Sequence, residues 1–131
     1  MSEYLFTYGT LRAKRDDGIA KYLAENSTLV DLGKLVGAQI YTINWYPGLI
    51  KTNDKSHVVY GDIFMIHNQD EVFKKLDEYE GIDIGLKPFE YKRELVEIIS
   101  TKQNVMCWAY FYNWDLPKNA KLINSGDFLN P

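Results

Sequence analysis

Carboxylates crowd the run Asp77-Glu78-Tyr79-Glu80-Gly81, and carboxylates are among the side chains that accept and return protons in enzymes. The run ends a segment with helical spacing, because Val72, Leu76 and Tyr79 lie four and three residues apart. A helix C-terminus disfavours negative charge, so these groups stand at the unfavourable end. An exposed acidic helix end is the ordinary explanation, since carboxylates are mostly solvated. On these residues alone, that explanation and proton transfer by Glu80 both remain open.

The pKa of Glu80 sets a condition on the second explanation. A base that works near neutral pH needs a pKa near 7, and glutamate starts at about 4.3. The helix dipole contributes about 0.3–1 kcal/mol, whereas one pKa unit corresponds to about 1.36 kcal/mol. Repulsion by neighbouring carboxylates acts in the same direction as the dipole. If Glu80 is a base, burial in an apolar, aromatic-lined cleft must provide most of the change.

A second candidate element, Tyr8-Gly9-Thr10-Leu11, follows a short apolar and aromatic run. A strand that turns sharply at Gly9 can point successive backbone amides into one concavity, and such a nest binds a carboxylate or an oxyanion. Glycine also lets a ligand approach the backbone closely. An ordinary turn remains the commoner explanation of Gly-Thr after a strand.

Other reactive side chains indicate no further chemistry. His57 and His67 are ten residues apart, and no cysteine or carboxylate joins them at metal-ligand spacing. Cys107 lies in an apolar stretch where nothing nearby in sequence lowers the pKa of its thiol, so we expect it to be buried and inert. The sequence has no P-loop, no dinucleotide-binding glycine triplet and no nucleophile elbow. We therefore expect no metal and no cofactor.

Composition bounds the class of protein. The 131 residues, 46% apolar and 25% charged, fit a single domain over residues 1–131. The net charge of −3 and the lack of a long basic run argue against a nucleic-acid partner. One cysteine excludes an internal disulfide, and we see neither a signal peptide nor an apolar run of about 20 residues. We expect a cytoplasmic monomer or homodimer with no membrane contact.

The elements that must position these groups are short. Strands are expected at Tyr4–Tyr8 and at Val58–Ile66, and one or two strands are expected over Leu29–Ile43 with a bend or bulge at Gly33 or Gly37. A helix over Gly18–Glu25 can be capped by Asp16 or Asp17. We expect turns at two places, Trp45–Gly48 and Asn53–Lys55.

The second half of the chain is also expected to form short elements. Asn68 and Glu71 suggest a capping box for the next helix, and Gly81 suggests its left-handed stop. Tyr91–Ile99 and Val105–Tyr112 suggest a hairpin, and a short strand is expected near Leu122. About six or seven strands with one or two flanking helices, in no βαβ alternation, predict an α+β fold built on a small mixed β-barrel.

At these residues the chain resembles the γ-glutamylcyclotransferase-like family, which includes the γ-glutamylamine cyclotransferases, AIG2-like proteins and many bacterial members. Each motif alone is weak, but the ordered set is specific and spans nearly the whole chain. The motifs are Tyr8-Gly9-Thr10-Leu11-Arg12, Tyr46-Pro47-Gly48-Leu49, Val59-Tyr60-Gly61-Asp62-Ile63-Phe64, Leu76-Asp77-Glu78-Tyr79-Glu80-Gly81, Tyr91-Lys92-Arg93, Trp108-Ala109-Tyr110-Phe111-Tyr112 and Ser125-Gly126-Asp127-Phe128-Leu129.

The resemblance implies that Glu80 is a general acid/base and that the backbone of Tyr8, Gly9, Thr10 and Leu11 holds a small γ-glutamyl substrate. The implied reaction frees an amine or amino acid while the γ-glutamyl group closes to 5-oxoproline. The amides of Tyr8–Leu11 would clamp either the α-carboxylate or the developing oxyanion. Tyr110 could offer its hydroxyl to the substrate, or it could be a core aromatic.

Two further expectations accompany the resemblance. The segment Ile82–Glu90 is expected to shape the leaving-group pocket. A non-catalytic module that binds a small carboxylate in the same cleft is the alternative function.

Overall fold

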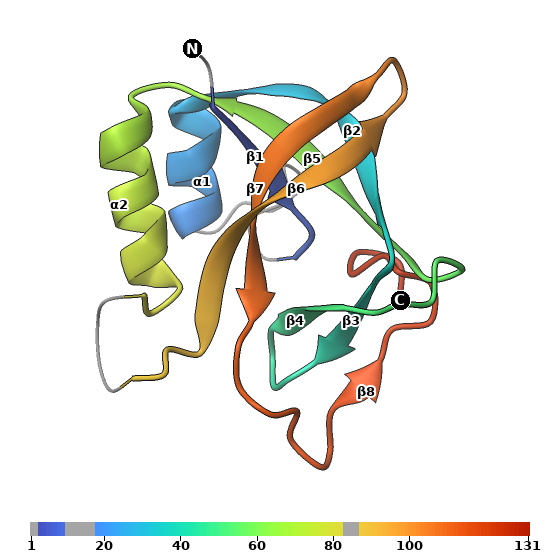
Figure 1. Cartoon of the computed structure of the whole chain (residues 1–131). Coiled ribbons are helices and arrows are strands. Elements are labelled where there is room, and N and C mark those ends of the chain that lie inside the picture. The colour runs from blue at the N-terminus through green and yellow to red at the C-terminus, as the bar shows by residue number, and fades with distance from the viewer. Residues whose placement is uncertain (1–2, 10–17, 83–86) are drawn as a thin grey trace.

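The computed structural model describes residues 3–9, 18–82 and 87–131 of the chain (Figure 1). Its helices are α1 (Gly18–Glu25) and α2 (Gln69–Tyr79). Its strands are β1 (Glu3–Thr7), β2 (Ser27–Val36), β3 (Ala38–Thr42), β4 (Pro47–Lys51), β5 (Val58–Ile66), β6 (Tyr91–Ser100), β7 (Asn104–Tyr112) and β8 (Lys121–Leu122). Five strands close into a barrel in the order β1, β5, β2, β6, β7, and β4, β3 and β8 form a second sheet. The predicted mixed barrel is confirmed.

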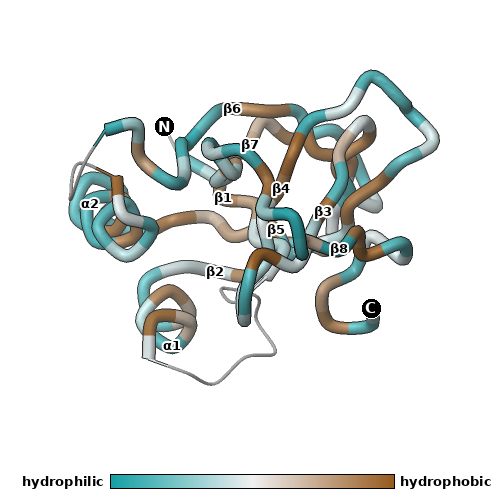
Figure 2. The backbone as a smooth tube through the Cα atoms, turned by 90° about the horizontal axis from the view of Figure 1, so that it is seen from below, coloured by the Kyte–Doolittle hydropathy of each residue, from teal (hydrophilic) through white to brown (hydrophobic). Residues whose placement is uncertain are grey.

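The barrel is mixed because β1 pairs with β5 antiparallel and with β7 parallel, where Leu5 lies opposite Trp108. β6 and β7 form the predicted hairpin, in register from Tyr91 opposite Tyr112. Apolar side chains form a buried cluster in the interior, and several strand segments are coloured as hydrophobic in Figure 2. At Gly33 a Cβ would stand 2.6 Å from Ile98 Cγ2, so the long strand β2 can approach this core only with glycine there.

The second sheet begins where Gly37, with φ of +76°, lets the chain turn from β2 into β3. The bend predicted at a glycine therefore lies at Gly37, and it divides one expected segment into two strands. The turn predicted at Trp45–Gly48 is wrong in its second half. Pro47 and Gly48 begin β4, with Pro47 opposite Thr42, and proline is tolerated as the first residue of a strand. Two strands over Leu29–Ile43 were already allowed within the predicted six or seven, so the extra strand β4 explains why eight form.

The two helices lie beside each other on one side of the barrel (Figure 1). Their buried residues, including Leu23, Val72 and Leu76, pack with Leu5 and Phe64 of the barrel strands in a second apolar cluster. α1 has the predicted bounds. Neither described helix is long and apolar enough to span a membrane.

The start of α2 differs from the prediction. Asn68 adopts a left-handed conformation with φ of 49°, and its side chain makes no capping hydrogen bond, so the capping box is wrong. The backbone carbonyl of Asn68 accepts from the Val72 amide at 3.0 Å instead. Of the three residues that indicated the helix by their spacing, Val72 and Leu76 are buried and Tyr79 is 42% exposed. The left-handed stop at Gly81 is confirmed by a φ of +79°.

Candidate active site

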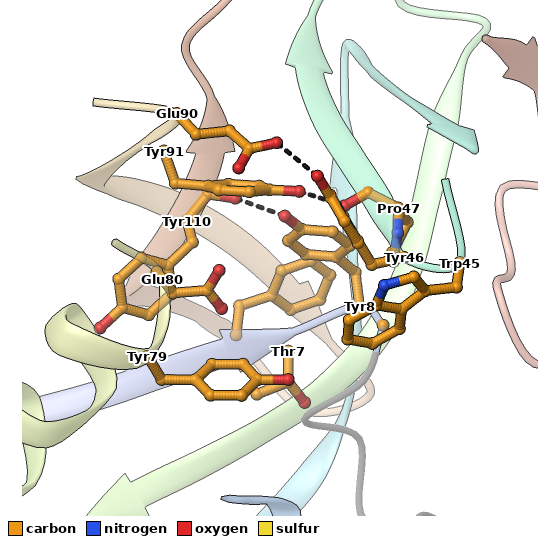
Figure 3. A pocket seen from close by; sticks show the side chains of 12 residues that line it. Thr7, Tyr8, Trp45, Tyr46, Pro47, Tyr79, Glu80, Glu90, Tyr91 and Tyr110 are labelled. Atoms are coloured by element: carbon orange, nitrogen blue, oxygen red, sulfur yellow. Dashed lines mark hydrogen bonds between the residues drawn. The ribbon is translucent and has the colours of Figure 1, made fainter. Parts of the chain in front are cut away.

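A cavity opens where the end of β1, the chain entering β4, the C-terminal end of α2 and the start of β6 meet (Figure 3). Its volume is about 200 Å³, below the ~300–1,000 Å³ typical of pockets for drug-sized ligands. It therefore suits one small chemical group. The lining residues are Phe6, Thr7, Tyr8, Gly9, Trp45, Tyr46, Pro47, Tyr79, Glu80, Glu90, Tyr91 and Tyr110.

Glu80 is positioned by the last turn of α2. Its amide donates to the Leu76 carbonyl at 2.9 Å, and the Ile82 amide donates to the Asp77 carbonyl at 2.8 Å. The left-handed Gly81 lies between them and reverses the chain. The helix end thus fixes the Glu80 backbone, and its partly buried carboxylate points into the cavity (Figure 3).

Burial raises the pKa of Glu80 from 4.5 to about 8, and repulsion from the carboxylates of Glu90 and Asp77 adds to the effect. Burial is the largest cause of the raised pKa. This agrees with the expectation that the helix dipole is too weak to raise the pKa of Glu80 this far. No Lys or Arg of the described residues forms an ion pair with Glu80 or Glu90. A carboxyl group in these surroundings is poised to gain and lose a proton near neutral pH.

Gly9 and Pro47 bring two of the sequence motifs into contact. A Cβ on Gly9 would lie 2.5 Å from Pro47 Cγ, so only glycine lets β1 end against the start of β4. A Cβ on Gly48 would lie 3.0 Å from the Tyr112 Cβ, so β4 also packs closely against β7. Gly9 and Pro47 both line the cavity, and their close packing shapes one part of its wall.

Tyrosine rings make up much of the remaining wall, and three of their hydroxyls donate to protein acceptors (Figure 3). The bonds run from Tyr8 to the Tyr110 carbonyl (2.6 Å), from Tyr91 to the Pro47 carbonyl (2.7 Å) and from Tyr46 to Glu90 Oε2 (2.6 Å). Burial raises the pKa of all three tyrosines. These hydroxyls stay protonated and occupied, so they fix the wall rather than serve as acids.

Tyr110 connects the cavity to a partly buried ion pair. Its hydroxyl donates to Asp77 Oδ1 at 2.7 Å, and Arg93 binds the same carboxylate from Nε at 3.0 Å and from its NH2 nitrogen at 3.2 Å. The Arg93 guanidinium lies over the rings of Phe73 and Trp108, 4.4 and 4.6 Å from their centroids. This network holds the last turn of α2, and hence Glu80, against the barrel.

Four of the residues singled out by sequence line one cavity: Glu80, Tyr8, Gly9 and Tyr110. Thr10 and Leu11 lie outside the described residues. Of the segment expected to shape the leaving-group pocket, Glu90 lines the cavity and residues 83–86 are not described.

Sequence reasoning missed Thr7 and Tyr46 as cavity residues, and it included Glu90 only as the end of the segment Ile82–Glu90. Tyr46 stood inside a motif treated as a turn, and Glu90 directly precedes the strand residue Tyr91. No local pattern distinguishes Thr7 from any other residue of a buried strand.

The side chains set aside by sequence have ordinary surroundings. His57 Nε2 lies 3.5 Å from Asp54 Oδ2, and His67 Nε2 lies 2.9 Å from Thr28 Oγ1. Burial raises the pKa of the Cys107 thiol to about 12, as expected of a core cysteine.

Comparisons with known proteins find similarity along nearly the whole chain. Residues 5–130 match the family model described as gamma-glutamyl cyclotransferase, AIG2-like. The gamma-L-glutamyl-butirosin B gamma-glutamyl cyclotransferase of Niallia circulans is 31% identical over 112 residues, covering 85% of this chain and 67% of that protein.

Solved structures show the same fold. Escherichia coli ytfP superposes with a TM-score of 0.68 at 26% identity, over 97% of this chain and 96% of that one. Bacillus subtilis YkqA superposes with a TM-score of 0.74 at 20% identity, over 99% of this chain. This chain spans only 40% of YkqA, so the likeness concerns one part of that protein.

Proposed function

The chain belongs to the γ-glutamyl cyclotransferase, AIG2-like family, which indicates an enzyme of the cyclotransferase type, and from this premise we propose its reaction and its acid/base. The reaction releases an amine or amino acid from a small γ-glutamyl substrate while the γ-glutamyl group closes to 5-oxoproline. Glu80 transfers the protons. The observation that carries this proposal is the Glu80 carboxylate, which faces a small cavity and has a pKa raised to about 8.

The pKa of Glu80 matches that of its proposed partner. A free α-amine has a pKa of about 7.7–8.0, and that of Glu80 is raised to about 8. Proton transfer from the substrate's α-ammonium to the carboxylate is therefore nearly balanced in free energy. An ordinary glutamate, about 3.5 pKa units more acidic than the amine, would need about 5 kcal/mol for the same transfer.

Proton movement can be followed atom by atom. The α-ammonium gives a proton to Glu80, and the freed amine attacks the γ-carbonyl carbon to form the ring C–N bond. Glu80 then donates this proton to the leaving nitrogen, and the former amide C–N bond breaks. The ring nitrogen loses a second proton by the same route, so the products are 5-oxoproline and a protonated amine. A positioned acid/base of this kind contributes about 10²–10⁴-fold to the rate.

The small volume of the cavity favours ring closure as well as proton transfer. An extended γ-glutamyl chain rarely brings its own amine against its γ-carbonyl, so a binding site must hold the folded conformer. A cavity of about 200 Å³ suits that compact form, with the leaving group directed to the open side where Trp45 is 68% exposed. In this proposal the backbone of Tyr8 and Gly9 supports the γ-glutamyl group.

Release of 5-oxoproline from a panel of γ-glutamyl amines, γ-glutamyl amino acids and γ-L-glutamyl-butirosin B tests the proposal. The last compound is included because the Niallia circulans relative is named for it. We expect the wild type to act on at least one class and Glu80→Gln to lose at least 100-fold in kcat. Glu78→Gln, which removes an exposed neighbouring carboxylate, should keep wild-type activity.

Full activity in Glu80→Gln would remove Glu80 from the mechanism. Saturable binding of γ-glutamyl compounds without release of 5-oxoproline from any of them would support the alternative, a module that binds a small carboxylate. The folded state of both variants is checked by thermal unfolding, so a loss of activity is not confused with a loss of fold.

A further inference from the structure

One side of the cavity joins an exposed aromatic ring to a carboxylate. Trp45, Tyr46 and Glu90 follow one another along this side, across from Glu80 (Figure 3). The rings of Trp45 and Tyr46 are in edge contact with centroids 5.2 Å apart, and the Tyr46 hydroxyl donates to Glu90 Oε2 at 2.6 Å. Trp45 is 68% exposed and Glu90 is half-buried, so this side of the cavity reaches the solvent. Trp45, Tyr46 and Glu90 are called the mouth residues below.

Glu90 is held in place but keeps one oxygen for a ligand. The Asn113 amide donates to the Glu90 carbonyl at 2.6 Å, and Tyr46 holds Oε2 of the carboxylate. No described residue donates a hydrogen bond to the other oxygen, Oε1. Among the described residues, the fully buried side-chain oxygens that lack a hydrogen-bond partner are those of Thr7 and Glu94, so Oε1 of Glu90 is open to a ligand.

The size of the cavity separates the two halves of the substrate. A volume of about 200 Å³ suits one small chemical group, which in the proposed function is the γ-glutamyl group with its ammonium at Glu80. The leaving group must then lie outside that volume, along the mouth residues. An inference about the mouth therefore rests on the proposed function, because it describes the other half of the same substrate.

The charge and the aromatic character of the mouth both favour a cation. None of the described Lys or Arg side chains forms an ion pair with Glu90, so its charge is available to a ligand. A carboxylate oxygen accepts a strong hydrogen bond from an ammonium, and an exposed indole ring attracts a cation to its face. A leaving group that carries a carboxylate would instead be repelled by Glu80 and Glu90.

We propose that the mouth residues select a leaving group that carries a second positive charge, placed a few carbon atoms beyond the scissile amide. The distal ammonium donates to Oε1 of Glu90 and lies against the Trp45 ring, and Tyr46 holds the Glu90 carboxylate in place. The preferred substrate is therefore a γ-glutamyl derivative of a diamine rather than of an amino acid.

Three γ-L-glutamyl amides of similar length test this preference. Their leaving groups are 1,5-diaminopentane, n-hexylamine and 5-aminopentanoate, so the distal end is an ammonium, a methyl group or a carboxylate. For 5-oxoproline release by the wild type, kcat/KM should be about 10- to 50-fold higher for the diamine than for hexylamine, and lowest for the carboxylate. The preference for the diamine should fall as NaCl is added, because salt screens a half-exposed charge pair.

Glu90→Gln keeps an acceptor for Tyr46 and removes the charge. The preference for the diamine over hexylamine should then fall below about 5-fold, which is the part that the Trp45 ring supplies, and Trp45→Leu should lower the wild-type preference by about 2- to 5-fold. Any change in the pKa of Glu80 affects all three substrates alike, so the ratio of their kcat/KM values isolates the role of Glu90. Glu78→Gln removes an exposed carboxylate that does not line the cavity, and it should keep the wild-type ratio.

Binding without turnover separates this inference from the proposed function. The diamine and hexylamine derivatives are titrated calorimetrically into Glu80→Gln, and into the same variant with Glu90→Gln added. Release of 5-oxoproline by the wild type with no preference for the diamine, or with a preference that survives Glu90→Gln, refutes the role of the mouth residues alone. Selective binding of the diamine derivative that depends on Glu90, with no release from any compound, refutes the proposed function alone. Equal or undetectable binding of both derivatives, with no release, refutes both.

Discussion

Replacing Glu80 with glutamine should stabilise the protein at neutral and alkaline pH while it abolishes catalysis. The pKa of Glu80 is raised in the folded state, so the folded protein holds a proton that the unfolded chain releases at a lower pH. The stability associated with this proton is fully present below pH 4.5 and is lost as the pH rises through about 8. Glutamine does not titrate, so the stability of Glu80→Gln lacks this pH dependence.

The size of the effect follows from the two pKa values. Between 4.5 and about 8, at about 1.36 kcal/mol per unit, the ionised carboxylate costs the folded state up to about 5 kcal/mol. At pH 5 the unfolded chain is already mostly ionised, and the cost is only about 1 kcal/mol. Between pH 5 and pH 8 the advantage of Glu80→Gln should therefore grow by as much as about 4 kcal/mol.

Urea unfolding followed by tryptophan fluorescence from pH 5 to pH 9 measures this difference. Glu78→Gln is the matched control, because it removes an exposed carboxylate two residues away on the same helix end. Its stability should follow that of the wild type across the whole range. A stability advantage of Glu80→Gln that does not change with pH, or a variant less stable than the wild type at pH 8, would contradict this reasoning. Either result would show that folding does not raise the pKa of Glu80 to about 8. That result would also remove the basis for its match to an α-amine.

Two further changes test the surroundings of Glu80. Glu90→Gln keeps an acceptor for Tyr46 but removes a carboxylate that raises the pKa of Glu80, so the acidic limb of kcat/KM against pH should move to lower pH; an unmoved limb would contradict this coupling. Gly9→Ala places a Cβ 2.5 Å from Pro47 Cγ and should destabilise the protein by about 1–3 kcal/mol in urea unfolding, with lower 5-oxoproline release; wild-type stability would show that β4 can move aside without cost.

Local sequence signals predicted the positions of helices and strands better than the contacts between them. The helix over Gly18–Glu25 and the stop at Gly81 follow from composition and from the freedom of glycine at positive φ. The Trp45–Gly48 turn was placed too late, because Pro and Gly are common in turns and nothing local shows that Pro47 pairs with Thr42. The capping box at Asn68 is wrong because asparagine favours both the N-cap and the left-handed conformation, and the chain enters α2 with Asn68 in the left-handed one.

The candidate site likewise has one part that could be predicted from sequence and one part that could not. The requirement that Glu80 be buried could be worked out from magnitudes, and its carboxylate faces the cavity in the structure (Figure 3). Glu90 was included only as the end of a segment expected to shape the leaving-group pocket, and no local pattern indicated Thr7. Their surroundings depend on residues far away in sequence. Glu90 is held by Tyr46, 44 positions away, and the Thr7 hydroxyl has no hydrogen-bond partner among the described residues.

The electrostatics of the cavity support a cation-binding role independently of any family likeness. Burying Glu80 at a helix C-terminus beside Glu90 opposes folding, and none of the described Lys or Arg side chains forms an ion pair with either carboxylate. A structural role would favour a neutral side chain here, because replacing a buried charge by a neutral group of similar size is often stabilising. A ligand that brings a positive group into the cavity would offset part of this cost. An α-ammonium does so, and its pKa allows it to give up that charge at the moment when its nitrogen must attack.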